Sequence, residues 1–213
     1  MIAKISYNQP MIMAKHSSLA GSQTEKSLLR QVCLQKRKQT LECCPDVQAQ
    51  LCEVIEKWLS QQAVSCVGFY RPFRSEPDIT PAVAAWAEKQ KGRKLCVPVV
   101  EDKRNCRMHY AIWRASEASR VGSFGIEEPA EDIAAVPEII FSPCVGVTRS
   151  GFRLGNGGGY FDRYLAWRAA AGNSPVATVA VALEALVIEK FEVSYFDVAF
   201  DWIATEAGVV PAL

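Results

Sequence analysis

The sequence predicts an α/β fold: a single domain with a mostly parallel sheet and helices on both faces, in a Rossmann-like three-layer arrangement. Two observations predict it. Short apolar runs recur between amphipathic or turn-rich segments, and a chain of 213 residues that is 49% hydrophobic can bury a sizeable core. Because strands that alternate with helices favour parallel pairing, with both faces of the sheet covered, we expect one such catalytic domain over residues 22–213.

Four segments are predicted to be helical. Residues 22–60 contain no glycine and carry apolar side chains at helical spacing, and Pro45 divides this stretch into two helices. A third helix is expected from Asp78 to Lys91, with a proline in its first turn and a glycine after its end, and a fourth from Gly159 to Ala171.

Six apolar runs are predicted to be strands, because they are short and bounded by turn residues. They are Val64–Tyr70, Lys94–Val99, Met108–Trp113, Glu138–Phe141, Val176–Ala182 and Trp202–Thr205. Residues 1–21 have no comparable pattern, and we expect them to form a flexible N-terminal extension.

The charge balance argues against two classes of partner. The 24 lysines and arginines nearly cancel the 23 aspartates and glutamates, so no global field attracts a nucleic acid or an anionic membrane. The longest apolar stretch, residues 176–188, is interrupted by Glu184 and is shorter than the roughly 20 residues of a membrane span. The first residues do not form a secretory signal. We expect a cytoplasmic, monomeric protein that acts on a small molecule.

The eight cysteines do not form a recognisable metal or disulfide pattern. None of them is spaced as C-x-x-C, and the chain has only two histidines, His16 and His109. We therefore expect reduced thiols and no zinc site.

The strongest candidate for a binding site is the glycine-rich run from Arg153 to Asp162, in which four of the residues 155–159 are glycine. Glycine permits a loop whose amides turn inward, and with the start of the following helix such a loop binds phosphates. Arg153 adds a forked donor, and Asp162 adds a hard oxygen suited to magnesium. A flexible turn is the alternative for the glycine cluster alone. The spacing fits neither the dinucleotide fingerprint nor the P-loop.

Two further features can be interpreted either as ligand-binding residues or as ordinary solvent-exposed residues. Lys26 and Arg30 lie four residues apart, so on a helix they share a face that points at a triphosphate or at solvent. Glu76 follows a predicted strand, and its carboxylate suits either a ligand amine or amide, or solvent.

These pieces occur in the order found in the 5-formyltetrahydrofolate cyclo-ligases, and the chain resembles that family over roughly residues 22–210. The matching motifs are Lys26-x-x-x-Arg30, Tyr70-x-Pro72-x-x-x-Glu76, Val97-Pro98-Val99, Gly125-Ile126-x-Glu128-Pro129, Arg153-Leu154-Gly155-x-Gly157-x-Gly159-Tyr160-Phe161-Asp162-Arg163 and Asp201-x-Ile203-x-Thr205-Glu206. The sequence departs from the family at Val147 and Thr148, where Phe and Asp are common, and at Phe161, where Tyr is common.

The resemblance implies an enzyme that uses ATP and Mg²⁺ to close 5-formyltetrahydrofolate into 5,10-methenyltetrahydrofolate, with release of ADP and phosphate. It implies catalytic roles for Arg153 and Tyr160, folate contacts from Arg71, Glu76 and Tyr160, and magnesium ligation by Asp162 with Asp197 as a second ligand. The residues implied to hold ATP are Lys26, Arg30, Arg153, Leu154, Gly155, Asn156, Gly157, Gly158, Gly159, Tyr160 and Phe161.

Two other classes of function remain open from the sequence. A phosphosugar isomerase on a related α/β scaffold would bind phosphate without hydrolysing a nucleotide. A folate-binding module would bind 5-formyltetrahydrofolate without ATP-dependent turnover, but it has no use for a triphosphate clamp of Lys26, Arg153 and Asp162.

Overall fold

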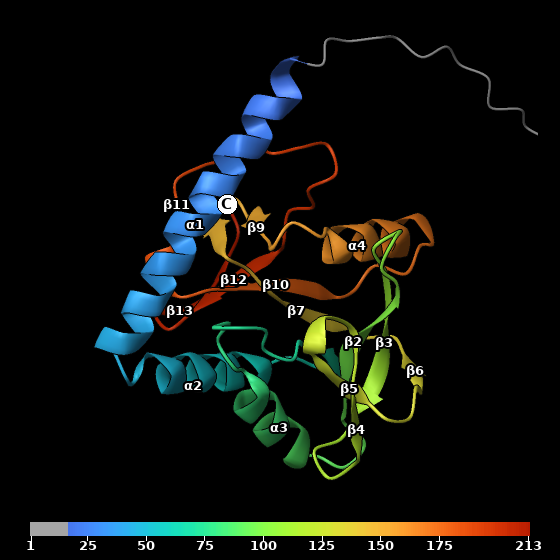
Figure 1. Ribbon diagram of the computed structural model, residues 1–213. Helices are drawn as coiled ribbons and strands as arrows, with labels where there is room; N and C mark the ends of the chain where they lie inside the picture. The colour runs from blue at the N-terminus through green and yellow to red at the C-terminus, as the bar shows by residue number, and fades with distance from the viewer. Residues whose placement is uncertain (1–16) are drawn as a thin grey trace, which may run out of the picture.

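The computed structural model describes residues 17–213 (Figure 1). Residues 1–16, which make up most of the expected N-terminal extension, lie outside the described residues. Helix α1 begins at Ser17, so residues 17–21 belong to a helix. Within residues 17–213, no helix combines the length and apolar character that a bilayer crossing needs.

One large sheet forms the centre of the molecule, in the order β13-β12-β10-β7-β1-β2-β3-β6. Its five central strands are parallel, and β13, β3 and β6 add antiparallel edges. The mostly parallel sheet is therefore confirmed. The strands are β1 Cys66–Gly68, β2 Lys94–Asp102, β3 Arg107–Trp113, β6 Ala134–Ala135, β7 Ile139–Pro143, β10 Ala177–Val181, β12 Trp202–Thr205 and β13 Gly208–Pro211.

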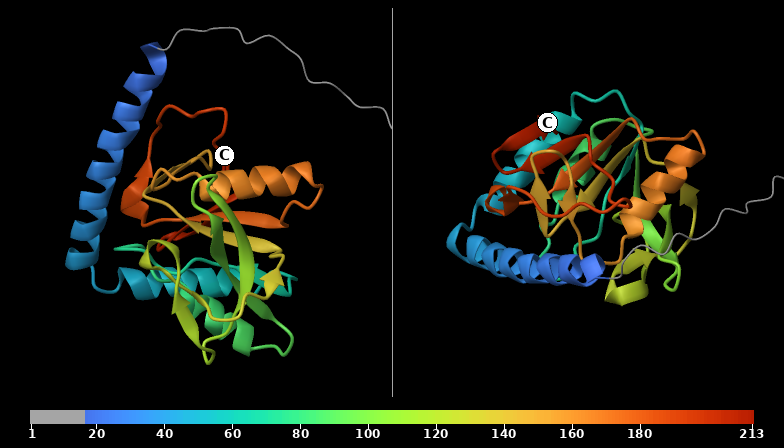
Figure 2. Two further views of the ribbon diagram at one scale, coloured as in Figure 1. Left: turned by 45° about the vertical axis from the view of Figure 1, so that its right-hand side comes forward. Right: turned by 90° about the horizontal axis from the view of Figure 1, so that it is seen from above.

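Four α-helices lie within the described residues, where the sequence predicted them. They are α1 Ser17–Cys43, α2 Val47–Leu59, α3 Thr80–Glu88 and α4 Tyr160–Ala170. Pro45 lies in the break between α1 and α2, as expected from its missing amide hydrogen. Helices α2 and α3 cover one face of the sheet and α4 the other, while α1 runs along one side of the molecule (Figures 1 and 2). The prediction of helices on both faces is confirmed.

Several short elements were not predicted. A three-stranded sheet joins β8 (Gly146–Thr148), β9 (Arg153–Leu154) and β11 (Val187–Ile188). A two-stranded sheet joins β4 (Ser119–Val121) and β5 (Glu127–Pro129), and the 3₁₀ turns η1 and η2 cover Ser123–Gly125 and Glu184–Leu186. Strands of two or three residues are too short for a period of two to be recognised.

The core lies between the sheet and the helices. All five residues of β10 are buried, which explains why this strand is a continuous apolar run rather than an alternating one. On the α2 side, the Trp58 ring packs 6.2 Å from the Phe141 ring and 5.4 Å from the Trp202 ring, measured between centroids. These contacts fix α2 on the sheet.

A close backbone contact predicts a stability loss at Gly151, which has φ +80°. In Gly151→Ala the added methyl carbon would lie 2.2 Å from the Phe200 carbonyl oxygen. Gly172 also has positive φ, +71°, but no neighbour within 4 Å, so Gly172→Ala reports backbone strain alone, about 1 kcal/mol. We expect Gly151→Ala to lower the free energy of unfolding by clearly more, measured by urea titration. Equal losses in the two variants would contradict the clash.

Candidate active site

The glycine-rich loop connects β9 to the start of α4, as the sequence predicted (Figure 1). Gly157 has φ +101° and Gly159 has φ +66°, a region that side chains rarely adopt. Gly159 is the N-cap of α4, so the loop ends at the positive end of an 11-residue helix. Residues 156–158 are exposed. The loop therefore has the geometry of an anion site that is open to solvent.

Two basic side chains of α1 reach this loop region. The Arg30 Nε donates a hydrogen bond to the Gly155 carbonyl oxygen at 2.8 Å. The Lys26 Nζ pairs with the Asp197 Oδ2 at 2.8 Å and lies 5.3 Å from the centre of the Phe191 ring. Lys26 and Arg30 thus form one face of α1 that points at the site and not a solvated basic face.

Arg153 and Asp162 form a largely buried ion pair beneath the loop. The Arg153 Nη2 lies 2.5 Å from the Asp162 Oδ2, and Arg153 is only 8% exposed. Its guanidinium carbon lies 5.2 Å from the Phe161 ring centre and 5.4 Å from that of Phe200. A methyl carbon at Gly155 would lie 2.7 Å from the Arg153 Nη1. Arg153 therefore requires a glycine above it and aromatic rings beside it.

The two predicted magnesium ligands lie on neighbouring segments. The backbone N–H of Val198, the residue after Asp197, donates to the Asp162 Oδ1 at 3.2 Å. Residues 17–213 contain no group of three or more His, Cys, Asp or Glu side chains placed to hold a metal. Mg²⁺, however, is often held by one or two carboxylates together with substrate phosphates and water. The pair Asp162 and Asp197 beside an anion-binding loop fits that ion.

Glu76 is buried and connects the segment after β1 to the glycine-rich loop. Its Oε2 accepts a hydrogen bond from the Phe73 N–H at 2.9 Å, and its Oε1 accepts one from the Asn156 Nδ2 at 3.0 Å. Burial raises the pKa of Glu76 above its ordinary value, against the opposing effect of these hydrogen bonds. Glu76 is therefore not a solvated loop carboxylate.

The other two residues predicted to contact folate have different neighbours. The Tyr160 ring, at the start of α4, packs edge-on against the Phe124 ring of η1 with centroids 5.9 Å apart. Arg71 contacts a different set of residues. Its guanidinium donates to the Thr80 Oγ1 at 3.2 Å and the Glu127 Oε2 at 3.0 Å, and lies 5.5 Å from the Trp113 ring.

The structure places Leu154 differently from its neighbours in the glycine-rich run. Its side chain is 1% exposed and belongs to the core, and its carbonyl oxygen accepts the Val145 N–H at 2.7 Å. Leu154 therefore anchors the loop to the small sheet, while the exposed residues that follow it are free to contact a ligand.

Comparison with known proteins identifies the family of the chain. Residues 22–206 match the 5-formyltetrahydrofolate cyclo-ligase family. The chain belongs to this family. A protein of Mycolicibacterium smegmatis named 5-formyltetrahydrofolate cyclo-ligase is 29% identical over 202 residues, which are 90% of this chain and 99% of that protein.

Solved structures give the same result for the fold. The 5,10-methenyltetrahydrofolate synthetase of Aquifex aeolicus matches with a TM-score of 0.67 and 29% identity, over 88% of this chain and 92% of that one. The synthetase of Mycoplasma pneumoniae matches with a TM-score of 0.67 and 19% identity, over 85% and 99%, which supports the fold alone. The protein is thus a ligase of the cyclo-ligase family.

Sequence reasoning missed two residues that contact or lie near the candidate site residues. Phe124 packs on Tyr160, and no spacing rule connects them across 36 residues. Arg37 is 1% exposed and lies beside Glu76 and Ser75. Arg37 follows Lys26 by 11 residues and Arg30 by seven, which places all three on one helical face. That periodicity was the available signal.

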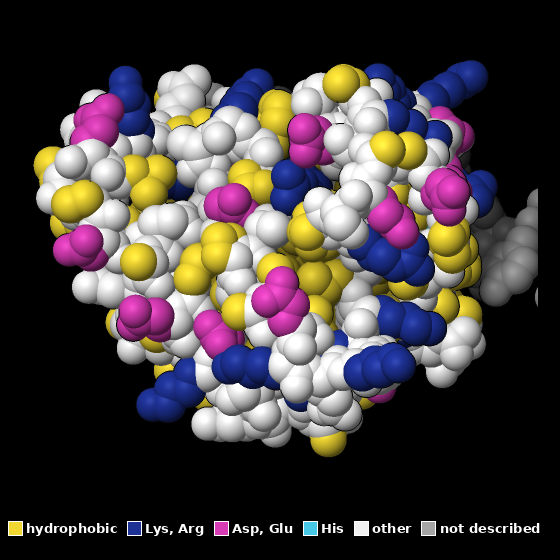
Figure 3. Space-filling view, turned by 90° about the horizontal axis from the view of Figure 1, so that it is seen from below, with side chains coloured by type: hydrophobic (Ala, Val, Ile, Leu, Met, Phe, Trp, Pro, Cys, Tyr) yellow, Lys and Arg dark blue, Asp and Glu magenta, His cyan; other side chains and the backbone are white. Residues whose placement is uncertain are grey.

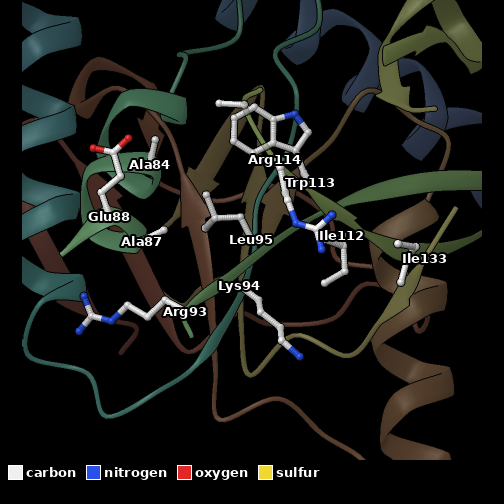
Figure 4. A pocket seen from close by; sticks show the side chains of 11 residues that line it. Ala84, Ala87, Glu88, Arg93, Lys94, Leu95, Ile112, Trp113, Arg114 and Ile133 are labelled. Atoms are coloured by element: carbon white, nitrogen blue, oxygen red, sulfur yellow. The ribbon is translucent and has the colours of Figure 1, made fainter. Parts of the chain in front are cut away.

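A separate hollow lies away from the glycine-rich loop. The face of the molecule seen in Figure 3 is hollowed, with hydrophobic side chains inside and both basic and acidic ones around it. A cavity of about 390 Å³ there lies between α3, the start of β2 and the end of β3 (Figure 4). Leu95 and Trp113 line it, with Arg93 and Lys94 at its edge. None of the residues predicted for the site belongs to its described lining, although Arg71 packs on the Trp113 ring.

The Lys26–Asp197 pair makes a prediction for acid stability. Hydrogen bonds from Lys26 and Ser194 outweigh burial, so the pKa of Asp197 is lowered from its ordinary value. The stabilisation is present above the ordinary pKa of aspartate, about 4, and is lost as the pH falls through the lower folded-state pKa. Asp197→Asn should therefore be less stable than wild type at pH 7, and the difference should shrink below about pH 4.

Urea unfolding at several pH values measures this difference. Glu192→Gln, a change of an exposed carboxylate in the same loop, is the matched control and should show little effect. A difference for Asp197→Asn that stays constant down to pH 2 would exclude the charged pair as its source.

Proposed function

We propose that this protein cyclises 5-formyltetrahydrofolate to 5,10-methenyltetrahydrofolate, using ATP with Mg²⁺ and releasing ADP and phosphate. The observation that carries the proposal is the convergence of Arg30 and Arg153 on a glycine-rich loop before α4, with Lys26 paired to Asp197 on a neighbouring segment, in a chain of the cyclo-ligase family. The named activities of the Mycolicibacterium and Aquifex relatives support it.

ATP would be held by its phosphates at the glycine-rich loop. The exposed backbone of Asn156, Gly157 and Gly158 offers amide donors, and the start of α4 adds its partial positive charge. Lys26 and Arg30 add full positive charges from α1. Phosphoryl transfer chiefly requires positioning and charge neutralisation, which this set of residues supplies.

Asp162 and Asp197 would hold Mg²⁺ beside the phosphates. The ion, when bound, neutralises the charge that develops on the transferred phosphoryl group. Each carboxylate is paired with a cation of the same site, Asp162 with Arg153 and Asp197 with Lys26. We propose that these cations turn from the carboxylates to the phosphates as nucleotide and ion bind.

The folate would lie against Glu76 and Tyr160. The ionised Glu76 carboxylate is an acceptor for a ring N–H or amino group, and Tyr160 with Phe124 offers aromatic surface for a flat ring. Arg71 suits a carboxylate of the same substrate, because it is a forked donor on the side of Trp113.

The chemistry explains why ATP is required. The oxygen of a formamide is a poor leaving group, and transfer of the terminal phosphoryl group to it makes it a good one. Nitrogen 10 of the folate then attacks the activated carbon on nitrogen 5, and phosphate leaves. This attack is intramolecular, so the protein mainly holds the folate conformation and stabilises charge. The reaction does not require a protein nucleophile.

The direct test is near-ultraviolet absorbance of the purified protein with 5-formyltetrahydrofolate and Mg²⁺, with and without ATP. We expect the methenyl product to accumulate only with ATP, together with one ADP per product. Folate binding without product in the presence of ATP would favour a binding module. If the protein neither binds the folate nor forms product, the phosphosugar isomerase becomes the favoured alternative.

The Asp162→Asn variant tests the proposed magnesium ligand. The amide keeps the size of the side chain and can accept one of its hydrogen bonds, but it loses the negative charge that binds Mg²⁺. We expect kcat to fall by about 100-fold or more, while the Kd for 5-formyltetrahydrofolate, measured by titration, changes little. Asp46→Asn, at the exposed turn before α2, is the control. Wild-type turnover in Asp162→Asn would remove this residue from the site.

A further inference from the structure

Arg37 is a buried cation that the proposed reaction does not yet use. It is 1% exposed on α1, and its Nε donates to the Ser75 Oγ at 3.2 Å. Its Nη1 is buried without a hydrogen-bond partner among the described residues. A buried guanidinium costs free energy unless an opposite charge compensates it. The position of Arg37 therefore needs an explanation.

Glu76 carries the opposite charge that acts most strongly on Arg37, although the two side chains form no direct ion pair among the described residues. Electrostatic attraction between them raises the pKa of Arg37 against burial, and Arg37 in turn opposes the burial that raises the pKa of Glu76. The Ser75 hydroxyl that Arg37 contacts belongs to the residue just before Glu76. Arg37 thus approaches the Glu76 segment from α1.

The other cations of the site have direct polar contacts with other parts of the site. Arg153 pairs with Asp162 and Lys26 pairs with Asp197, while Arg30 binds the Gly155 carbonyl oxygen. Among the described residues, the hydrogen-bond donors to Glu76 are neutral. After burial, the Phe73 and Asn156 hydrogen bonds have the largest effect on the pKa of Glu76, and among charged groups Arg37 lowers this pKa more than Arg153 does.

We infer that Arg37 is a positioning residue for Glu76: it keeps the Glu76 carboxylate charged and oriented between the Phe73 amide and Asn156, ready to accept a hydrogen bond from the folate. The inference rests on the proposed function for the role of the folate, but the pairing of Arg37 with Glu76 can be tested without it.

Folate binding should depend on pH through the protonation of Glu76. The charged and titratable groups that face Glu76 are Arg37 from α1, Arg153 from β9, Tyr70 after β1 and Cys144 after β7. Tyr70 and Cys144 stay neutral near pH 7, because burial raises the pKa of Tyr70 well above its ordinary value and that of Cys144 to about 12. Of these four groups, only the two arginines favour the ionised carboxylate, and they add to the effect of the Phe73 and Asn156 hydrogen bonds.

Removal of Arg37 should therefore shift the pH profile of folate binding. In Arg37→Met the pKa of Glu76 rises, so Glu76 takes up a proton at a higher pH than in wild type. As the solution is acidified, the KM for 5-formyltetrahydrofolate therefore begins to rise at a higher pH than in wild type, so the midpoint of the profile moves up. Lys36→Met removes the same charge from an exposed position of α1 and should leave the midpoint unchanged. Equal midpoints in the two variants would overturn the inference.

A second measurement compares stabilities and does not depend on activity. It therefore remains informative if Arg37→Met folds poorly. In the double variant Arg37→Met/Glu76→Gln neither buried charge remains, so at pH 8 its urea midpoint should exceed that of Arg37→Met alone. A double variant no more stable than Arg37→Met would overturn the pairing. If the double variant is rescued but Glu76→Gln leaves the folate KM unchanged, the pairing stands and the folate role of Glu76 is wrong.

Discussion

The ion pair between Arg153 and Asp162 holds together the parts of the chain that form the site. Arg153 is on β9, Asp162 is in the first turn of α4, and the Val198 amide binds the same carboxylate from a third segment. A buried guanidinium requires a partner, and its flat faces pack well on aromatic rings. Asp162 is the charged partner, and the rings of Phe161 and Phe200 pack beside the guanidinium. The path of the glycine-rich loop is thus set by the side chain beneath it.

The glycines follow from this constraint as much as from ligand binding. Gly155 lies where a side chain would collide with the Arg153 guanidinium, and Gly151 lies where one would collide with the backbone that presents Phe200. Gly157 and Gly159, in contrast, have positive φ, which lets the loop turn before α4. The run therefore combines two requirements, space for a buried cation and a backbone shape that suits phosphates.

The main elements could be predicted from the sequence because their patterns are local. The break at Pro45, the helix after Gly159 and the apolar run of β10 each depend on a few neighbouring residues. Contacts between distant residues could not be predicted in the same way. Asn156 binds Glu76 across 80 positions, and the small sheets contain strands of only two or three residues. The burial of Arg37 also depends on the segment that packs against α1.

The long helix α1 links the two ends of the proposed site. Lys26 and Arg30 lie at the nucleotide end, and Arg37 lies at Glu76, where the folate is proposed to bind. Eleven residues separate Lys26 from Arg37, or about 16 Å along a helix axis. A helix is stiff over this length. The distance between Lys26 at the nucleotide end and Arg37 beside the Glu76 segment is therefore set by helix geometry. A change in the packing of α1 would therefore move the nucleotide and folate contacts together.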